Sequence, residues 1–122
     1  MKDITDNLDT RAIQAQKAFC VERGARYVPA PAESKLGYAL KTKGKLPLNG
    51  LRHPAQGDTC GWYIWCGEEY SGARDFFEPL HVQHIYEEEP SLTRLLGLPP
   101  GYRFLLHGDY LDVWYDASLL DV

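Results

Sequence analysis

Residues 60–79 read CGWYIWCGEEYSGARDFFEP and form the segment richest in aromatic side chains, which also contains two of the three cysteines. Its WYIW core favours extended structure and is flanked by glycine on both sides. Alternation along a strand places Trp62 and Ile64 on one face, and Tyr63 and Trp65 on the other. Because both faces are apolar, the segment predicts a central strand covered on both sides.

The composition is that of a folded domain. The chain has 122 residues, 44% of them hydrophobic and 25% charged, with a formal net charge of -4. An acidic chain lacks the basic stripe of a nucleic-acid binder, so we expect no nucleic-acid partner. No run approaches the ~18 apolar residues of a membrane span, and the odd cysteine count is typical of a reducing compartment. These features predict a cytoplasmic protein with no membrane partner.

The first part of the chain predicts an amphipathic helix over about residues 3–23, followed by a proline-rich connector. Gly24 is placed to cap the helix at its C-terminus. The apolar face of this helix has the four- and three-residue spacing of Ile4, Leu8, Ala12, Ala15 and Phe19. Residues 34–41 alternate as a half-exposed strand whose basic side faces water, and residues 42–59, rich in glycine and proline, predict a long loop.

The second half predicts shorter elements around the central strand. Residues 80–86 fit either a strand or a helical turn, and residues 90–96 a short helix. Two alternating runs joined through Gly108 and Asp109 predict an antiparallel hairpin. The resulting fold class is α+β, a single domain over residues 1–122 with an N-terminal helix, one short helix and an antiparallel sheet of four or five strands.

Two cysteines and two histidines are the candidates for metal or nucleophile chemistry. Cys60 and Cys66 are six residues apart, about 20 Å on a straight strand, which is too far to share an ion with His81 and His84 or to form a disulfide. Cys66 precedes acidic residues that favour the neutral thiol over a nucleophilic thiolate. We therefore expect no metal and no catalytic residue, and the lack of a phosphate-binding glycine motif predicts no cofactor.

Acidic residues gather after the predicted central strand. They form either a solvated surface, a carboxylate pair for acid–base chemistry, or a patch that recognises a basic protein. Within the patch hypothesis, an aromatic side chain supplies the anchor that interface hot spots usually contain. The predicted partner-binding residues are Glu68, Glu69, Tyr70, Asp75 and Glu78.

Several segments from residue 61 onward resemble one bacterial family. They are GWYIW at 61–65, GEE at 67–69, FFEPLH at 76–81, LGLPPGYRFL at 96–105 and DVWYD at 112–116. This part of the chain, about residues 60–120, resembles the immunity-protein-like domain of the thirty-third class of polymorphic-toxin immunity proteins. The resemblance implies a cytosolic protein that neutralises a toxin by direct binding and catalyses no reaction.

Two other functions remain open at the level of sequence. One is a small ligand-binding domain or enzyme that uses a cleft near Trp65, Tyr70, His81 and His84. The other is a general protein-interaction domain on the same fold. The sequence identifies neither the toxin nor the oligomeric state.

Overall fold

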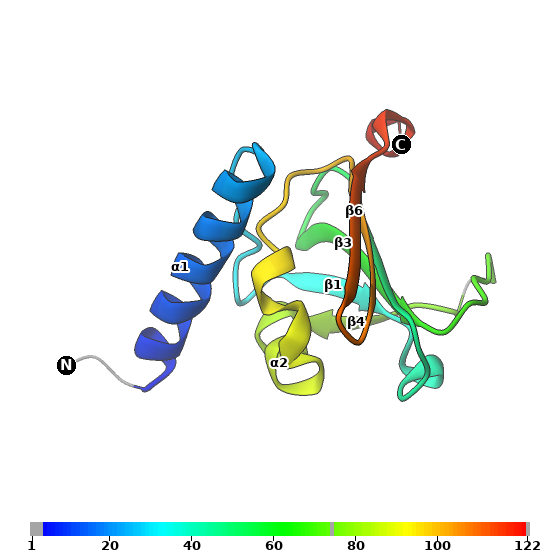
Figure 1. Cartoon of the computed structure of the whole chain (residues 1–122). Coiled ribbons are helices and arrows are strands. Elements are labelled where there is room, and N and C mark those ends of the chain that lie inside the picture. Colours follow the sequence, from blue (N-terminus) through cyan, green and yellow to red (C-terminus); the bar gives the residue numbers. More distant parts are fainter. Residues whose placement is uncertain (1–3, 74, 122) are drawn as a thin grey trace.

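A six-stranded sheet with helices packed on one of its faces forms the protein (Figure 1). The computed structural model describes residues 4–73 and 75–121. The elements are α1 (Ile4–Arg23), β1 (Lys35–Tyr38), η1 (Leu40–Thr42), β2 (Leu48–Arg52), β3 (Thr59–Cys66), β4 (Glu78–His81), α2 (Val82–Glu88), η2 (Pro90–Leu95), β5 (Tyr102–His107), β6 (Tyr110–Tyr115) and η3 (Ala117–Leu120). The α+β prediction is confirmed, with six strands rather than four or five.

The strands lie in the order β4-β1-β3-β2-β5-β6. Every neighbouring pair is antiparallel except β1 and β3, which are parallel. In Figure 1 the helices α1 and α2 lie to one side of this twisted sheet, while the loop between β3 and β4 projects on the other. The sheet therefore has one face covered by helices and a second face covered by loops, which we call the open face.

β3 is the central strand that the sequence predicts, with β1 on one side and β2 on the other. Trp62 and Ile64 are fully buried in the core between sheet and helices, together with Cys60 and Cys66. Trp65 belongs to a second apolar cluster on the open face. Burial on both faces of β3 is therefore confirmed.

The predicted loop over residues 42–59 is wrong in its centre, because it contains β2. Gly50 stands in the middle of β2, where a Cβ atom would lie 2.3 Å from the Phe104 ring. The glycine is thus required by an aromatic side chain of the neighbouring strand β5, which packs across it. The same glycine, seen in sequence alone, indicates a turn.

Residues 80–86 contain both of the structures that the sequence left open. β4 ends at His81 and α2 begins at Val82, so the chain changes from strand to helix between the two. Val82 and Ile85 are fully buried. The following short helix is confirmed as the 3-10 helix η2, whose apolar side chains are buried.

The N-terminal helix is confirmed, and Ala12 and Phe19 of its predicted apolar face are buried. Asp3 and the side chains of Ile4 and Leu8 lie outside the described residues, and Ala15 is exposed. Gln16 is buried instead, because its amide donates to Tyr86 Oη (3.1 Å) and to a backbone carbonyl of η2, and accepts from Tyr27 Oη. Gly24 has a φ of 68° and ends the helix as predicted.

β1 is shorter than the predicted strand over residues 34–41. Leu40 lies beyond its end in η1 and is 49% exposed. The prediction that the basic side of this strand faces water is also wrong, since Ala39 is fully buried and Gly37 lies beneath Tyr63 and Phe77. Small residues occur on this side of β1 because aromatic rings cover it.

A buried arginine at the end of β2 joins four segments of the chain. Arg52 is 2% exposed and has no carboxylate partner among the residues that the structure describes. Its guanidinium lies 5.6 Å from the Trp62 ring centroid, and burial lowers its pKa. It donates to the backbone carbonyls of Val28 (2.7 Å), Leu98 (2.8 Å), Cys60 (3.0 Å), Pro29 (3.1 Å) and Leu96 (3.5 Å).

All three cysteines are free and buried. In the described part of the chain no helix has the length and apolar character needed to cross a membrane.

Trp62→Ala is expected to lower the free energy of unfolding by about 3–5 kcal/mol. The indole is fully buried, and its Nε1 donates to the Leu96 carbonyl at 2.9 Å, so truncation leaves a cavity and removes the shorter hydrogen bond to this acceptor. Urea denaturation measures the loss. Val21→Ala, at a position that is 80% exposed, is the control and should change stability by less than about 0.5 kcal/mol. A loss under about 1 kcal/mol for Trp62→Ala would contradict the central position of β3.

Candidate partner-binding surface

The predicted partner-binding residues lie on and beside the loop between β3 and β4. Glu68, Glu69 and Asp75 are exposed, and Tyr70 is 59% exposed. Glu78 is exposed at the first position of β4, where it pairs with Tyr38 of β1. The structure thus places these side chains along one loop and the strand that follows it.

An aromatic cluster anchors this loop to the open face of the sheet. The Tyr70 ring lies 5.1 Å from the Trp65 ring, 5.9 Å from Phe76 and 6.0 Å from Phe77, measured between centroids. Phe77 also contacts Tyr63 of β3, at 5.2 Å. The two consecutive phenylalanines therefore fix the loop, and Tyr70 is held at the surface by rings beneath it.

One predicted acidic residue has a basic neighbour. Lys41 Nζ lies 3.2 Å from Asp75 Oδ2, and this hydrogen bond lowers the pKa of the Asp75 carboxyl. The hollow between the loop and η1 is lined by Lys41 and Lys45 as well as by Glu68 and Glu69. The surface near Tyr70 therefore carries both signs of charge, and among the described residues Glu68 and Glu69 form no ion pair.

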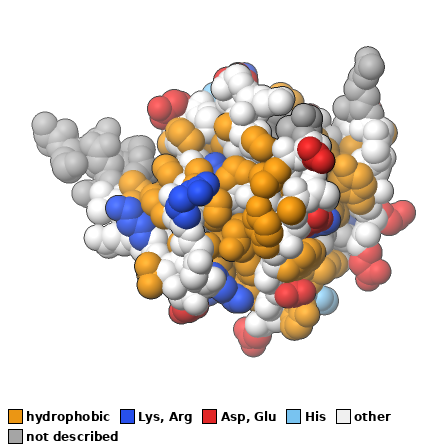
Figure 2. Space-filling model, turned by 90° about the horizontal axis from the view of Figure 1, so that it is seen from above, with side chains coloured by type: hydrophobic (Ala, Val, Ile, Leu, Met, Phe, Trp, Pro, Cys, Tyr) orange, Lys and Arg blue, Asp and Glu red, His pale blue; other side chains and the backbone are white. Residues whose placement is uncertain are grey.

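A second hollow, of about 310 Å³, lies on the other side of Tyr70. Tyr63, Tyr70 and Phe77 line it together with His53, whose Nδ1 donates to the Leu119 carbonyl at 2.9 Å. Sequence reasoning missed His53, since only the fold brings it next to the aromatic cluster. Figure 2, which views the molecule from above, shows hydrophobic side chains gathered across the middle of the face in view, with basic side chains beside them and acidic side chains mostly around the margin.

The rival cleft near Trp65, Tyr70, His81 and His84 is not assembled as one site. The His81 and His84 rings contact each other at 5.7 Å, at the junction of β4 and α2. Neither histidine lines the two hollows that Tyr70 borders, and Trp65 is buried beneath the loop. The aromatic residues and the histidines therefore belong to separate places on the surface.

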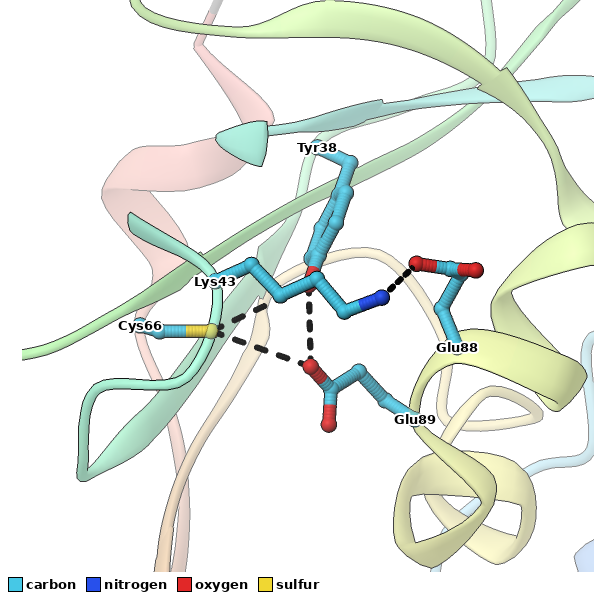
Figure 3. Close-up of polar contacts among 5 residues, drawn as sticks. All are labelled: Tyr38, Lys43, Cys66, Glu88 and Glu89. Carbon is cyan, nitrogen blue, oxygen red and sulfur yellow. Dashed lines mark hydrogen bonds and ion pairs between the residues drawn. The ribbon is translucent and has the colours of Figure 1, made fainter. Parts of the chain in front are cut away.

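A polar cluster at the edge of the main core was also not predicted from the sequence (Figure 3). Tyr38 Oη donates to Glu89 Oε2 at 2.9 Å, and Cys66 Sγ lies 3.9 Å from the same oxygen. Next to these residues Lys43 forms an ion pair with Glu88. These contacts join β1 and β3 to the segment between α2 and η2.

The chemistry of this cluster is that of a structural contact. Burial and the nearby Glu89 carboxylate raise the pKa of the Cys66 thiol. Burial, followed by the hydrogen bond to Glu89, raises the pKa of Tyr38. Since a nucleophilic cysteine needs a lowered pKa, Cys66 is held as a neutral thiol. Among residues 4–73 and 75–121, no group of three or more histidine, cysteine or acidic side chains could hold a metal ion.

The geometry defines a small α+β domain in which a rigid aromatic base presents an exposed loop. Comparison with known families agrees: the chain matches the Imm33-like domain over residues 15–116 and belongs to that family. The match includes the C-terminal part of α1 and the whole sheet, and so extends well before residue 60, where the sequence resemblance begins. The family's name indicates a family of immunity proteins. No curated protein and no solved structure matches the chain significantly.

The stability of the protein is expected to fall as the pH rises above about 9, the ordinary pKa of a cysteine thiol. The pKa values of Cys66 and Tyr38 are raised in the folded state, so the unfolded chain releases these protons first and is favoured at high pH. Below the unfolded pKa values this contribution is fully present. Urea denaturation between pH 7 and about 10.5 measures the decline.

Tyr38→Phe tests the assignment of this pH dependence. The variant should be less stable by about 1–3 kcal/mol at pH 7, because Glu89 loses its donor. Its stability should also decline less steeply above the tyrosine pKa. A variant with wild-type stability and an unchanged pH profile would show that the Tyr38–Glu89 contact does not stabilise the fold.

Proposed function

We propose that this chain is an immunity protein that binds a bacterial toxin in the cytoplasm and blocks it by direct contact, without catalysing a reaction. The observation that carries the proposal is membership of the Imm33-like domain family over residues 15–116. The state of Cys66 supports a binding role, since its raised pKa disfavours a cysteine nucleophile.

The loop between β3 and β4 is the surface that we assign to toxin binding. Tyr70 projects from a base of three aromatic rings, so little conformational freedom is lost when a partner covers it. Large rigid aromatics are the side chains most often found at binding hot spots. Glu68 and Glu69 lie next to Tyr70 and attract a basic surface on the toxin.

The contacts of the remaining predicted residues support different roles for them in the proposed interface. Because Asp75 pairs with Lys41, it contributes less free negative charge than Glu68 and Glu69 do. Glu78 is at the start of β4 and extends the acidic surface along the sheet edge. We therefore assign Tyr70, Glu68 and Glu69 to the centre of the interface, and Asp75 and Glu78 to its rim.

Co-purification with the toxin tests the function itself. The chain should form a stable complex with the toxin encoded beside its gene, and its expression should protect cells from that toxin. Absence of a complex combined with protection would favour an enzyme that acts on the toxin or its product. A complex without protection would favour a general protein-interaction domain.

The double variant Glu68→Lys/Glu69→Lys is expected to fold normally and to bind the toxin at least about tenfold more slowly at low salt. The difference should shrink as salt screens the charges. Stopped-flow or surface-plasmon measurements of the association rate at several salt concentrations test this.

Glu22→Lys/Glu33→Lys is the matched control, because it makes the same charge change at two exposed positions outside the loop. It should affect the association rate much less. If both double variants slow association equally, net charge rather than the loop controls the encounter. If neither does, the interface lies elsewhere on the protein.

A further inference from the structure

The two edges of the sheet differ in how they are protected from pairing with another strand. β4 is four residues long and contains Pro79, which has no backbone N–H to donate. β6 is six residues long, reads YLDVWY, and pairs with β5 without a register shift. Short strands, prolines, lysines and bulges are the usual means of blocking an edge, and β6 has none of these.

Alternate residues of β6 direct their backbone groups away from β5. The hairpin turn contains only Gly108 and Asp109, so His107 and Tyr110 form the hydrogen-bonded pair that closes it. The backbone N–H of Asp116 continues this alternation, since it donates to the Gly101 carbonyl at 2.7 Å. The backbone N–H and C=O groups that point outward therefore belong to Leu111, Val113 and Tyr115. In the described part of the chain no second strand pairs with these groups.

The side chains along this edge are largely apolar and partly uncovered. Leu111 and Val113 pack against the rim of the main core, and Tyr115, on the same side, is 52% exposed. On the open face Trp114 is 39% exposed, and the Arg103 guanidinium lies 5.6 Å from its ring centroid. A partner strand would therefore meet an apolar row on one side and an aromatic–basic pair on the other.

We propose that two copies of the chain pair through β6, antiparallel and about a two-fold axis at Val113, to form one continuous sheet. This register places Val113 opposite Val113 of the second copy and Leu111 opposite Tyr115. All three outward-directed residues of each copy then exchange backbone hydrogen bonds. The inference is independent of toxin binding.

The edge is complementary to itself, which favours a second copy over another partner. On the helix-covered side the row formed by Leu111, Val113 and Tyr115 is apolar in both copies and continues the core across the axis. On the open face Asp112 of one copy lies opposite Trp114 of the other. Arg103 pairs with Trp114 in register, and its guanidinium lies against the Trp114 ring, so the proposed register brings Arg103 close to that Asp112.

Arg103 remains accessible to a second carboxylate. Its Nη1 lies 3.4 Å from Asp116 Oδ2, and its side chain is still 30% exposed. By symmetry the proposed register forms two Arg103–Asp112 pairs. These pairs fix the register, because sliding one strand along the other by two residues separates them.

The neighbouring elements leave room for the second copy. η3 follows β6 but turns back over the open face, where the Leu119 carbonyl accepts from His53 after β2. α2 packs against β4, at the opposite end of the sheet. Figure 1 shows β6 at the end of the sheet, away from α1.

Sedimentation equilibrium of the purified chain over a wide concentration range tests the proposal. The mass should rise from 13.9 kDa toward twice that value. Amide exchange at Leu111, Val113 and Tyr115 should slow as the protein concentration rises. Val113→Pro changes a side chain at the rim of the core but removes an N–H that no β5–β6 hydrogen bond uses, so the β5–β6 pairs should remain and the variant should be a monomer.

Asp112→Lys keeps the backbone unchanged and places a lysine next to Arg103 of the second copy. It should raise the dissociation constant of the dimer at least about tenfold. Glu22→Lys, with the same charge change at an exposed position of α1, should dimerise as the wild type does. Circular dichroism confirms that each variant is folded.

Two results would overturn the proposal. One is a wild-type chain that stays at 13.9 kDa at every concentration. The other is a dimer that persists unchanged in both Asp112→Lys and a folded Val113→Pro. If the chain is monomeric but Val113→Pro weakens toxin binding, the edge accepts a strand of the toxin and the second-copy assignment is wrong.

Discussion

The fold depends on the burial of Arg52 among backbone carbonyls. A guanidinium has five N–H donors in a planar arrangement, and here they are used by carbonyls from β3, from residues 28–29 and from residues 96–98. Each buried carbonyl left without a donor costs about 1–3 kcal/mol. One side chain therefore supplies donors to three segments of the chain, and it fixes the irregular stretches before β1 and before β5.

This contact also organises the main core. Trp62 lies between Arg52, which is close to its ring, and the Leu96 carbonyl, which accepts from its Nε1. Because residues 96–98 follow η2, the helices are held over the face of β3 that contains Trp62 and Ile64. The open face is then left for the second cluster around Trp65, and it is this cluster that supports the loop carrying Tyr70. The main core and the proposed binding loop thus rest on opposite faces of the same strand.

Much of the fold could be predicted because its information is local. The two-sided alternation of β3, the glycine after α1 and the two-residue hairpin turn each need only a few neighbouring residues. β2 could not be predicted, since Gly50 is explained by Phe104, a residue of another strand. For the same reason Arg52 looks like an exposed charge in the sequence, and only the assembled fold shows its acceptors.

The candidate site divides in the same way. The acidic and aromatic character of the loop is visible in the sequence, whereas the Lys41–Asp75 pair and the position of His53 depend on contacts between distant segments. The polar cluster likewise joins distant segments, since Tyr38 ends β1, Cys66 ends β3 and Glu89 lies between α2 and η2. The pattern of charged residues in a sequence therefore indicates a charged surface. Which of those charges are free depends on the ion pairs that form in the folded protein.

The central claim is that the protein acts by binding and not by turnover. Titrating a fixed amount of active toxin with the purified chain tests it most directly. The account predicts that toxin activity falls linearly and reaches zero at a fixed stoichiometric ratio of chain to toxin, however long the mixture is incubated. Continued loss of activity with time at a small fraction of that ratio would show catalytic inactivation and would contradict the account.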